Sequence, residues 1–139
     1  MPQLVRTSIS LEKSLLDRLE RLVKESRYTN RSEFIRDMIR QHLVEQQWAD
    51  QAQEVVGTIT LVYDHHVRLL ARKLTDIQHD HLHQVLATTH VHLSHDLCAE
   101  MIMVRGSARQ LRRIADNLRR QRGVLHAALT MSSTGESLR

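Results

Sequence analysis

The sequence THVHLSHDLC, residues 89–98, contains the side chains of this chain that are best suited to bind a metal ion. His90 and His92 are two positions apart, and Cys98, the only cysteine, follows six positions after His92. Imidazole nitrogen and thiolate sulfur are ligands of zinc, copper and nickel. A single cysteine excludes an internal disulfide, and it excludes a zinc site with two cysteines from one chain. The stretch therefore predicts a mixed nitrogen and sulfur site.

A hairpin would place these ligands on one face of a sheet. Two strands are predicted at 83–93 and 97–104, with a turn between them. This turn pairs Leu93 with Leu97, His92 with Cys98, and His90 with Glu100. Because opposed residues have Cβ atoms roughly 5 Å apart, an imidazole and a thiolate so placed can share one ion. Glu100 is near enough to accept a hydrogen bond that orients the His90 ring.

A complete site needs a fourth ligand. The sequence QHDHLH supplies His79, His81 and His83, any of which could reach across an oligomer interface. A planar set of four ligands favours Ni(II) or Cu(II), and a tetrahedral set favours zinc. Eight of the ten histidines lie between residues 65 and 95, which separates this chemistry from the basic N-terminal part of the chain.

The elements that must position these residues follow from the spacing of apolar side chains. Strands are predicted at 54–63, 83–93, 97–104 and 124–131, and helices at 65–78 and 107–123, which gives the order βαββαβ. Ser107 is the expected N-cap of the second helix and Gly123 its terminating residue. Residues 46–53 are predicted to end a helix and form a polar linker, and the last eight residues a frayed tail.

The N-terminal part is predicted to be a βαα module. Residues 5–11 alternate between apolar and polar side chains, as in a strand, and two amphipathic helices follow. Asn30 is the expected N-cap of the second helix, with Glu33 completing a capping box. A lone strand of seven residues is not stable by itself, so a dimer with two such strands paired antiparallel is expected.

The polar face of this strand suits DNA. A two-stranded ribbon fits the major groove, where Arg6, Ser8 and Ser10 can bind base edges. The start of the second helix, at Asn30, Arg31 and Ser32, offers backbone N–H groups to a phosphate. An ordinary amphipathic strand within a monomer is the alternative for this pattern alone.

Composition is consistent with this division. The chain has 139 residues, a formal net charge of +4 and 41% hydrophobic residues, of which few are aromatic. The positive charge favours an anionic partner. No run approaches the roughly 20 apolar residues of a membrane helix, and the N-terminus lacks the apolar core of a signal peptide. We therefore expect a cytoplasmic protein with no membrane partner, and we place its domains at residues 1–49 and 54–133.

Two family resemblances follow from these motifs. The strand RTSISL, the two helices and the turn YTNRSEFIRDMIR resemble the ribbon-helix-helix family of dimeric DNA-binding proteins. That resemblance implies base reading by Arg6, Ser8 and Ser10. Relatives often have glycine just before the tyrosine that ends the first helix, a position that Arg27 occupies here.

The spacing H-x10-H-x-H-x5-C, met by His79, His90, His92 and Cys98, resembles the nickel-responsive ribbon-helix-helix regulators. The resemblance implies an α+β chain whose C-terminal βαββαβ unit is ACT-like, of the ferredoxin type, and forms a homotetramer flanked by two DNA-binding dimers. It implies one Ni(II) per subunit in a planar site, with three ligands from one subunit and His79 from a neighbour.

The same resemblance implies further positions. Glu33 and Asp37 match carboxylate ligands of a potassium-like cation between the domains, although a solvated acidic pair explains them as well. Tyr63 and His65 match positions near the outer shell of the metal site or the domain interface.

The expected function is a nickel-responsive regulator, a repressor of nickel uptake that binds double-stranded operator DNA when Ni(II) is bound. One alternative is a ribbon-helix-helix regulator that senses copper, zinc, cobalt or a small molecule through its ACT-like domain. A metalloenzyme is a third reading, which we do not favour because three or four protein ligands leave little room for a substrate.

Overall fold

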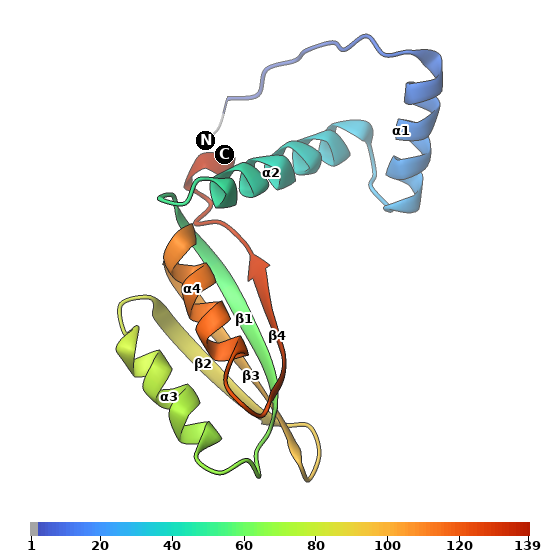
Figure 1. Ribbon diagram of the computed structural model, residues 1–139. Helices are drawn as coiled ribbons and strands as arrows, with labels where there is room; N and C mark the ends of the chain where they lie inside the picture. The colour runs from blue at the N-terminus through green and yellow to red at the C-terminus, as the bar shows by residue number, and fades with distance from the viewer. Residues whose placement is uncertain (1–2) are drawn as a thin grey trace. The chain divides into compact units, whose positions relative to one another are not determined.

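Buried side chains alternate with less buried ones along β1 (Glu54–Asp64), which is one of the two inner strands of a four-stranded antiparallel sheet. The computed structural model describes residues 3–139. The other strands are β2 (Val85–His92), β3 (Leu97–Ser107) and β4 (Val124–Met131), and the sheet order is β2-β3-β1-β4. Two helices, α3 (Leu70–Asp80) and α4 (Ala108–Arg119), lie on one face of this sheet (Figure 1). The predicted ferredoxin-type βαββαβ unit is confirmed.

The core lies between the helices and the sheet. Leu111, Ile114 and Leu118 of α4 are buried in this core, together with Leu70 and Leu74 of α3. The three α4 residues recur at spacings of three and four positions, which places them on one side of the helix.

Local signals in the sequence fix both ends of α4. Ser107 accepts a hydrogen bond from the Gln110 backbone, and the Gln110 side chain accepts one from the Ser107 backbone, which makes a capping box. Gly123 has φ +99°, and a Cβ there would lie 2.8 Å from Leu70, so the chain needs glycine where α4 turns into β4.

The other face of the sheet carries exposed apolar side chains. Val91 of β2 and Met101 and Met103 of β3 are between 44% and 47% exposed, and Leu93 beyond the end of β2 is 55% exposed. These residues alternate with the helix-facing ones, so they share the face that α3 and α4 do not cover.

The N-terminal unit comprises residues up to Leu43 together with Ser137–Arg139, and the second unit spans Val44–Glu136. The first contains α1 (Lys13–Glu25) and most of α2 (Arg31–Ala49). The turn between these helices closes with hydrogen bonds from Arg27 N to Lys24 O and from Tyr28 N to Val23 O. This is the Schellman pattern, and Arg27 takes the left-handed φ of +59° that glycine usually supplies.

The expected cap of α2 is present in part. The Asn30 side chain accepts a hydrogen bond from the Glu33 backbone at 3.0 Å. The Glu33 carboxylate, however, pairs with Arg36 and not with the Asn30 backbone. Half of the predicted capping box is therefore formed.

Three sequence expectations are met only in part. Residues 5–11 are extended but not part of a strand, because the described chain offers no second strand for them to pair with. The helix end predicted within residues 46–53 is confirmed, because α2 ends at Ala49, but the stretch is not polar throughout, since Trp48 is 1% exposed and its indole N–H donates to Ser132 O at 2.7 Å. The last residues are not frayed throughout, because they include a short 3-10 helix, Glu136–Leu138.

The helix expected at 65–78 begins later, at Leu70. Residues 65–69 form turns, and Leu69 adopts a left-handed φ of +64° immediately before the helix. Among the described residues, no helix is long and apolar enough to cross a membrane.

Candidate metal centre and nucleic-acid interface

Strands β2 and β3 pair in the register that the sequence predicts, with His92 opposite Cys98 and His90 opposite Glu100. The Nδ1 atom of His92 lies 3.3 Å from the Cys98 sulfur. The His90 and His92 ring centroids are 5.0 Å apart. The hairpin therefore gathers the two imidazoles and the thiol on the helix-facing side of the sheet.

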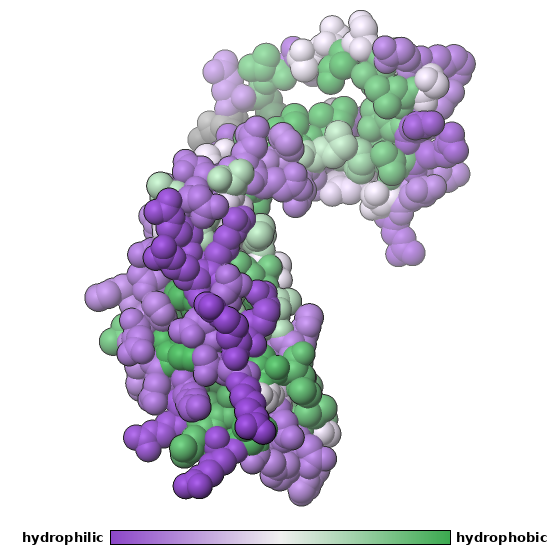
Figure 2. Space-filling view, viewed as in Figure 1, coloured by the Kyte–Doolittle hydropathy of each residue, from purple (hydrophilic) through white to green (hydrophobic). Residues whose placement is uncertain are grey.

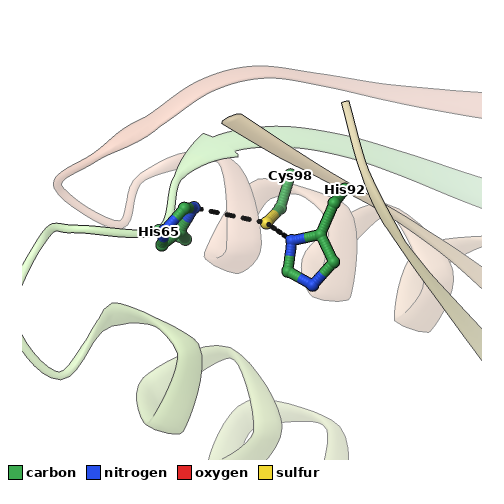
Figure 3. Close-up of side chains that lie close together, drawn as sticks. All are labelled: His65, His92 and Cys98. Atoms are coloured by element: carbon green, nitrogen blue, oxygen red, sulfur yellow. Dashed lines mark hydrogen bonds between the residues drawn. The ribbon is translucent and has the colours of Figure 1, made fainter. Parts of the chain in front are cut away.

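A residue outside the predicted ligand set also reaches the sulfur. His65 Nδ1 lies 3.7 Å from Cys98 Sγ and approaches the sulfur from a different direction than His92 does (Figure 3). The ligand atoms of His65, His92 and Cys98 all lie within 4.8 Å of one another. His65 follows the end of β1, where Tyr63 pairs directly with Cys98. The family resemblance implied a position for His65 near the outer shell of the metal site or the domain interface, and its contact with the sulfur agrees with the first of these.

His90 is held differently from His92. Its Nδ1 atom lies 3.3 Å from Glu100 Oε1 and 3.2 Å from the Tyr63 hydroxyl. With Nδ1 engaged, Nε2 is the nitrogen that remains for a metal ion. A histidine ligand oriented by a carboxylate at its other nitrogen is a common arrangement in metal sites.

Glu100 is the centre of a buried polar network. It is 6% exposed and accepts hydrogen bonds from the Tyr63 hydroxyl at 3.0 Å and from the Gln78 amide at 3.1 Å. Thr88 in turn donates to Gln78 at 2.6 Å. Burial raises the pKa of Tyr63, and the nearby Glu100 carboxylate raises it further, so the phenol remains protonated and a donor.

His79 is not brought to this group within one chain. It lies exposed in the last turn of α3, and it belongs to neither of the two histidine clusters found in residues 3–139. Its neighbour Gln78 is the residue of that turn that reaches the Glu100 network.

The donor chemistry fits nickel. Two or three imidazole nitrogens and one thiolate, with a buried carboxylate that orients a ring, form a set that nickel, copper or zinc accepts.

The residues expected to bind DNA lie in the N-terminal unit and are exposed. Arg6, Ser8 and Ser10 belong to the extended N-terminal segment. At the start of α2, Asn30 caps the helix, and the Arg31 guanidinium pairs with Glu20 at 3.0 Å. Ser32 is exposed in the first turn of α2.

The expected cation ligands both have protein partners in this unit. Glu33 pairs with Arg36, and Asp37 pairs with Arg40 at 3.0 Å. Asp37 also accepts a hydrogen bond from the Tyr28 hydroxyl at 2.6 Å, which lowers the Asp37 pKa. A potassium-like ion at these carboxylates would therefore have to displace guanidinium groups.

Comparison with known proteins assigns both parts of the chain. Residues 5–46 match the model of the ribbon-helix-helix protein, copG family, and residues 56–132 match the NikR C terminal nickel binding domain. A protein of Solibacter usitatus named "Putative nickel-responsive regulator" is 49% identical over the whole of both chains. One of the same name from Geobacter metallireducens is 47% identical over 99% of each chain.

Together the fold and these matches define a ribbon-helix-helix transcriptional regulator with an appended ferredoxin-type domain. The chain belongs to the family of nickel-responsive regulators, which are regulators and not enzymes.

A solved structure shares part of the fold. An uncharacterized protein from Thermotoga maritima superimposes with a TM-score of 0.51 at 10% identity, covering 56% of this chain and 96% of that one. At this identity the likeness concerns the fold alone.

Proposed function

We propose that this protein is a repressor of nickel-uptake genes that binds operator DNA when Ni(II) is bound. The observation that carries the proposal is the convergence of His92 and His90 with the only cysteine on one hairpin, in a chain that also has a ribbon-helix-helix unit. When bound, the metal would supply a link between subunits.

The proposed ligands are His90, His92 and Cys98 of one subunit and His79 of a neighbour, with one Ni(II) per subunit. Glu100 and Tyr63 support this set because they fix the His90 ring through Nδ1. The exposed position of His79 leaves it available to another copy. His65 would then not be a ligand, and its imidazole would contact the Cys98 sulfur while metal is absent.

The proposed assembly is a homotetramer, a dimer of dimers. In the N-terminal unit an apolar groove lies between the extended segment, α1 and α2, and its lining includes Ile9, Leu15, Leu22 and Met38. Figure 2 shows apolar surface gathered around this hollow. A second copy could pair its residues 5–11 with residues 5–11 of the first. This pairing would cover the groove and complete a two-stranded ribbon. In the second unit, the exposed apolar face of the sheet is a surface for tetramer formation.

Metal and DNA would be linked thermodynamically. If the ion joins His79 of one subunit to the hairpin of another, it favours one arrangement of the assembly. Should that arrangement bind two operator half-sites more tightly, DNA must raise the affinity for metal by the same factor. As a regulator of transcription, the protein would act in the cytoplasm, where bacterial DNA lies.

The potassium-like cation at Glu33 and Asp37 stays a secondary proposal, since both carboxylates pair with arginines. Added KCl should strengthen DNA binding relative to NaCl at equal ionic strength if such a site forms.

DNA binding can be tested without knowledge of the operator. Fragments that bind the full-length protein in the presence of Ni(II) are first selected from double-stranded DNA of random sequence. The affinity of the protein for one selected fragment is then measured with and without Ni(II), Zn(II) or Cu(II). We expect Ni(II) to raise the affinity and Arg6→Ala to reduce binding to the level of unrelated DNA. Arg109→Ala is the matched control, because it removes one exposed arginine from α4 in the other unit. Equal binding with and without metal would contradict the proposal, as would equal effects of the two variants.

The ligand set has a separate test. Absorption titration with Ni(II) should produce a thiolate-to-metal band that Cys98→Ala abolishes and His79→Ala, His90→Ala and His92→Ala weaken. His126→Ala, an exposed histidine on β4, is the control. If His65→Ala removes the band and His90→Ala does not, the ligands are His65, His92 and Cys98 instead.

A further inference from the structure

A second group of possible ligands lies at the surface, where the turn between β2 and β3 meets the connection from β1 to α3. His66 Nε2 lies 2.9 Å from Asp96 Oδ1, and His95 Nδ1 lies 3.0 Å from the same oxygen. The rings of His66 and His95 have centroids 5.5 Å apart. We propose that His66, His95 and Asp96 form a second divalent-metal site that is separate from the one at Cys98.

The distances are those of neighbouring ligands around one ion. With metal–ligand bonds of about 2.1 Å, adjacent donors in a tetrahedral or octahedral sphere are about 3.0–3.4 Å apart. The two nitrogen-to-oxygen distances in this cluster, 2.9 and 3.0 Å, are close to that range. A cation would replace the protons that now bridge the rings to the carboxylate.

Hydrogen bonds to the backbone hold the two segments together without using a ligand atom of the cluster. His65 N donates to Asp96 O at 3.0 Å, which joins the β1–α3 connection to the hairpin turn. Within the connection, His66 N donates to the Asp64 side chain at 2.9 Å. Within the turn, the backbone N–H groups of Asp96 and Leu97 donate to Ser94 Oγ. Little ordering is therefore needed when an ion binds, because the chain already holds the ligands near one another.

The ligands indicate which ions this site would take. It has two imidazoles and one carboxylate but no thiolate, a set that suits zinc, nickel, cobalt and copper. The side chains are well exposed, 51% for His66, 88% for His95 and 65% for Asp96, so water would complete the coordination. With three solvated protein ligands, this site should bind more weakly than the Cys98 site and fill after it.

The two sites share no ligand, and this separates the inference from the proposed nickel response. The ring of His65 lies 4.1 Å from that of His66, but its Nδ1 atom is directed to the Cys98 sulfur. Loss of the surface site should therefore leave the thiolate-to-metal band in place.

The test is metal stoichiometry of the full-length protein. Equilibrium dialysis against Ni(II), Zn(II) or Co(II), with the bound metal quantified by mass spectrometry, should reveal one weaker equivalent per chain beyond the tight one. The double variant His66→Ala/His95→Ala should lose that equivalent and keep the thiolate band, and Asp96→Asn should weaken the equivalent by at least about tenfold. The double variant His81→Ala/His83→Ala is the control, since it removes two histidines outside the cluster.

Three outcomes would overturn the inference. One is equal stoichiometry in the wild type and in His66→Ala/His95→Ala, with folding of both verified by circular dichroism. Another is loss of the weaker equivalent in the control variant. The third is a Cys98→Ala protein that binds no metal at all, since the surface site does not use the thiolate. A missing thiolate band in the wild type would instead count against the proposed nickel site alone.

Discussion

Replacing Tyr63 with phenylalanine tests whether the network around Glu100 holds the metal-binding hairpin in place. The Tyr63 side chain is fully buried, and its hydroxyl donates to Glu100 at 3.0 Å and contacts His90 at 3.2 Å. Phenylalanine keeps the ring and removes only this hydroxyl. The carboxylate, 6% exposed, would then lose one of its donors with little access to water.

The size of the effect follows from the remaining partners. A hydrogen bond to a charged group contributes about 1.5–3 kcal/mol. Glu100 keeps the donors Gln78 and His90, so we expect the lower part of that range, about 1.5–2 kcal/mol of unfolding free energy. In a domain of this size, that loss lowers the melting temperature by roughly 6–16 °C.

The difference between the two proteins should depend on pH. The pKa of Tyr63 is raised in the folded protein, so its stabilisation is fully present below the unfolded value of about 10 and is lost as pH rises through the higher folded value. Tyr63→Phe lacks this group. The unfolding free energy that Tyr63→Phe loses relative to the wild type should therefore be constant around neutral pH and become smaller above about pH 10.

Trp48 provides the assay, because it is the only tryptophan and is buried in the same unit as Tyr63. Urea unfolding of metal-free protein is followed by its fluorescence at one fixed protein concentration, since the stability of an oligomer depends on concentration. The control is Tyr28→Phe, which removes a hydroxyl bonded to Asp37 in the N-terminal unit and should change the transition reported by Trp48 much less. A loss for Tyr63→Phe below about 0.5 kcal/mol, or equal to that of the control, would refute the reasoning.

Other predictions concern the caps and turns. Arg27→Gly should stabilise the N-terminal unit by about 1 kcal/mol, because Arg27 occupies a left-handed φ. A lower midpoint of urea unfolding, followed by the circular dichroism signal of the helices, would contradict this. Ser107→Ala should lower the unfolding free energy by about 1 kcal/mol, because it removes the capping box with Gln110. The urea midpoint of Trp48 fluorescence measures this loss. Tyr28→Phe should raise the Asp37 pKa, which carbon-13 NMR titration measures. The stabilisation from that hydrogen bond is fully present above the unfolded Asp37 pKa of 3.8, and it is lost as pH falls through the lower folded pKa. An Asp37 titration that is the same in both proteins would argue against the contact.

The βαββαβ order of the second unit could be predicted because its signals are local, whereas its ferredoxin-type fold was implied by the family resemblance. Alternating apolar residues mark the strands, Ser107 and Gly123 bracket α4, and a short turn fixes the pairing of His92 with Cys98. Each of these features depends on residues a few positions apart. The sequence pattern is therefore sufficient to place them.

The features that were missed depend on contacts between distant parts of the chain. Trp48 lies in a polar stretch, yet it packs into the core and binds Ser132, 84 positions away. The direct contact of His65 with the Cys98 sulfur forms because β1 pairs with β3; the family resemblance had implied only a position near the site, and ligand spacing does not reveal the contact. The start of α3 was placed too early, because apolar spacing does not show the turns at residues 65–69.

Three features of the single chain would be completed by contacts with further copies of it. Within the described residues 3–139, residues 5–11 have strand spacing but no strand to pair with. The sheet exposes Met101 and Met103, and His79 lies outside the hairpin cluster. Each is a separate reason to expect association, and together they would couple metal binding to assembly. If His79 must come from a neighbour, an ion that binds tightly also selects the assembled state. Metal affinity should then rise with protein concentration in the wild type, and it should not do so in His79→Ala.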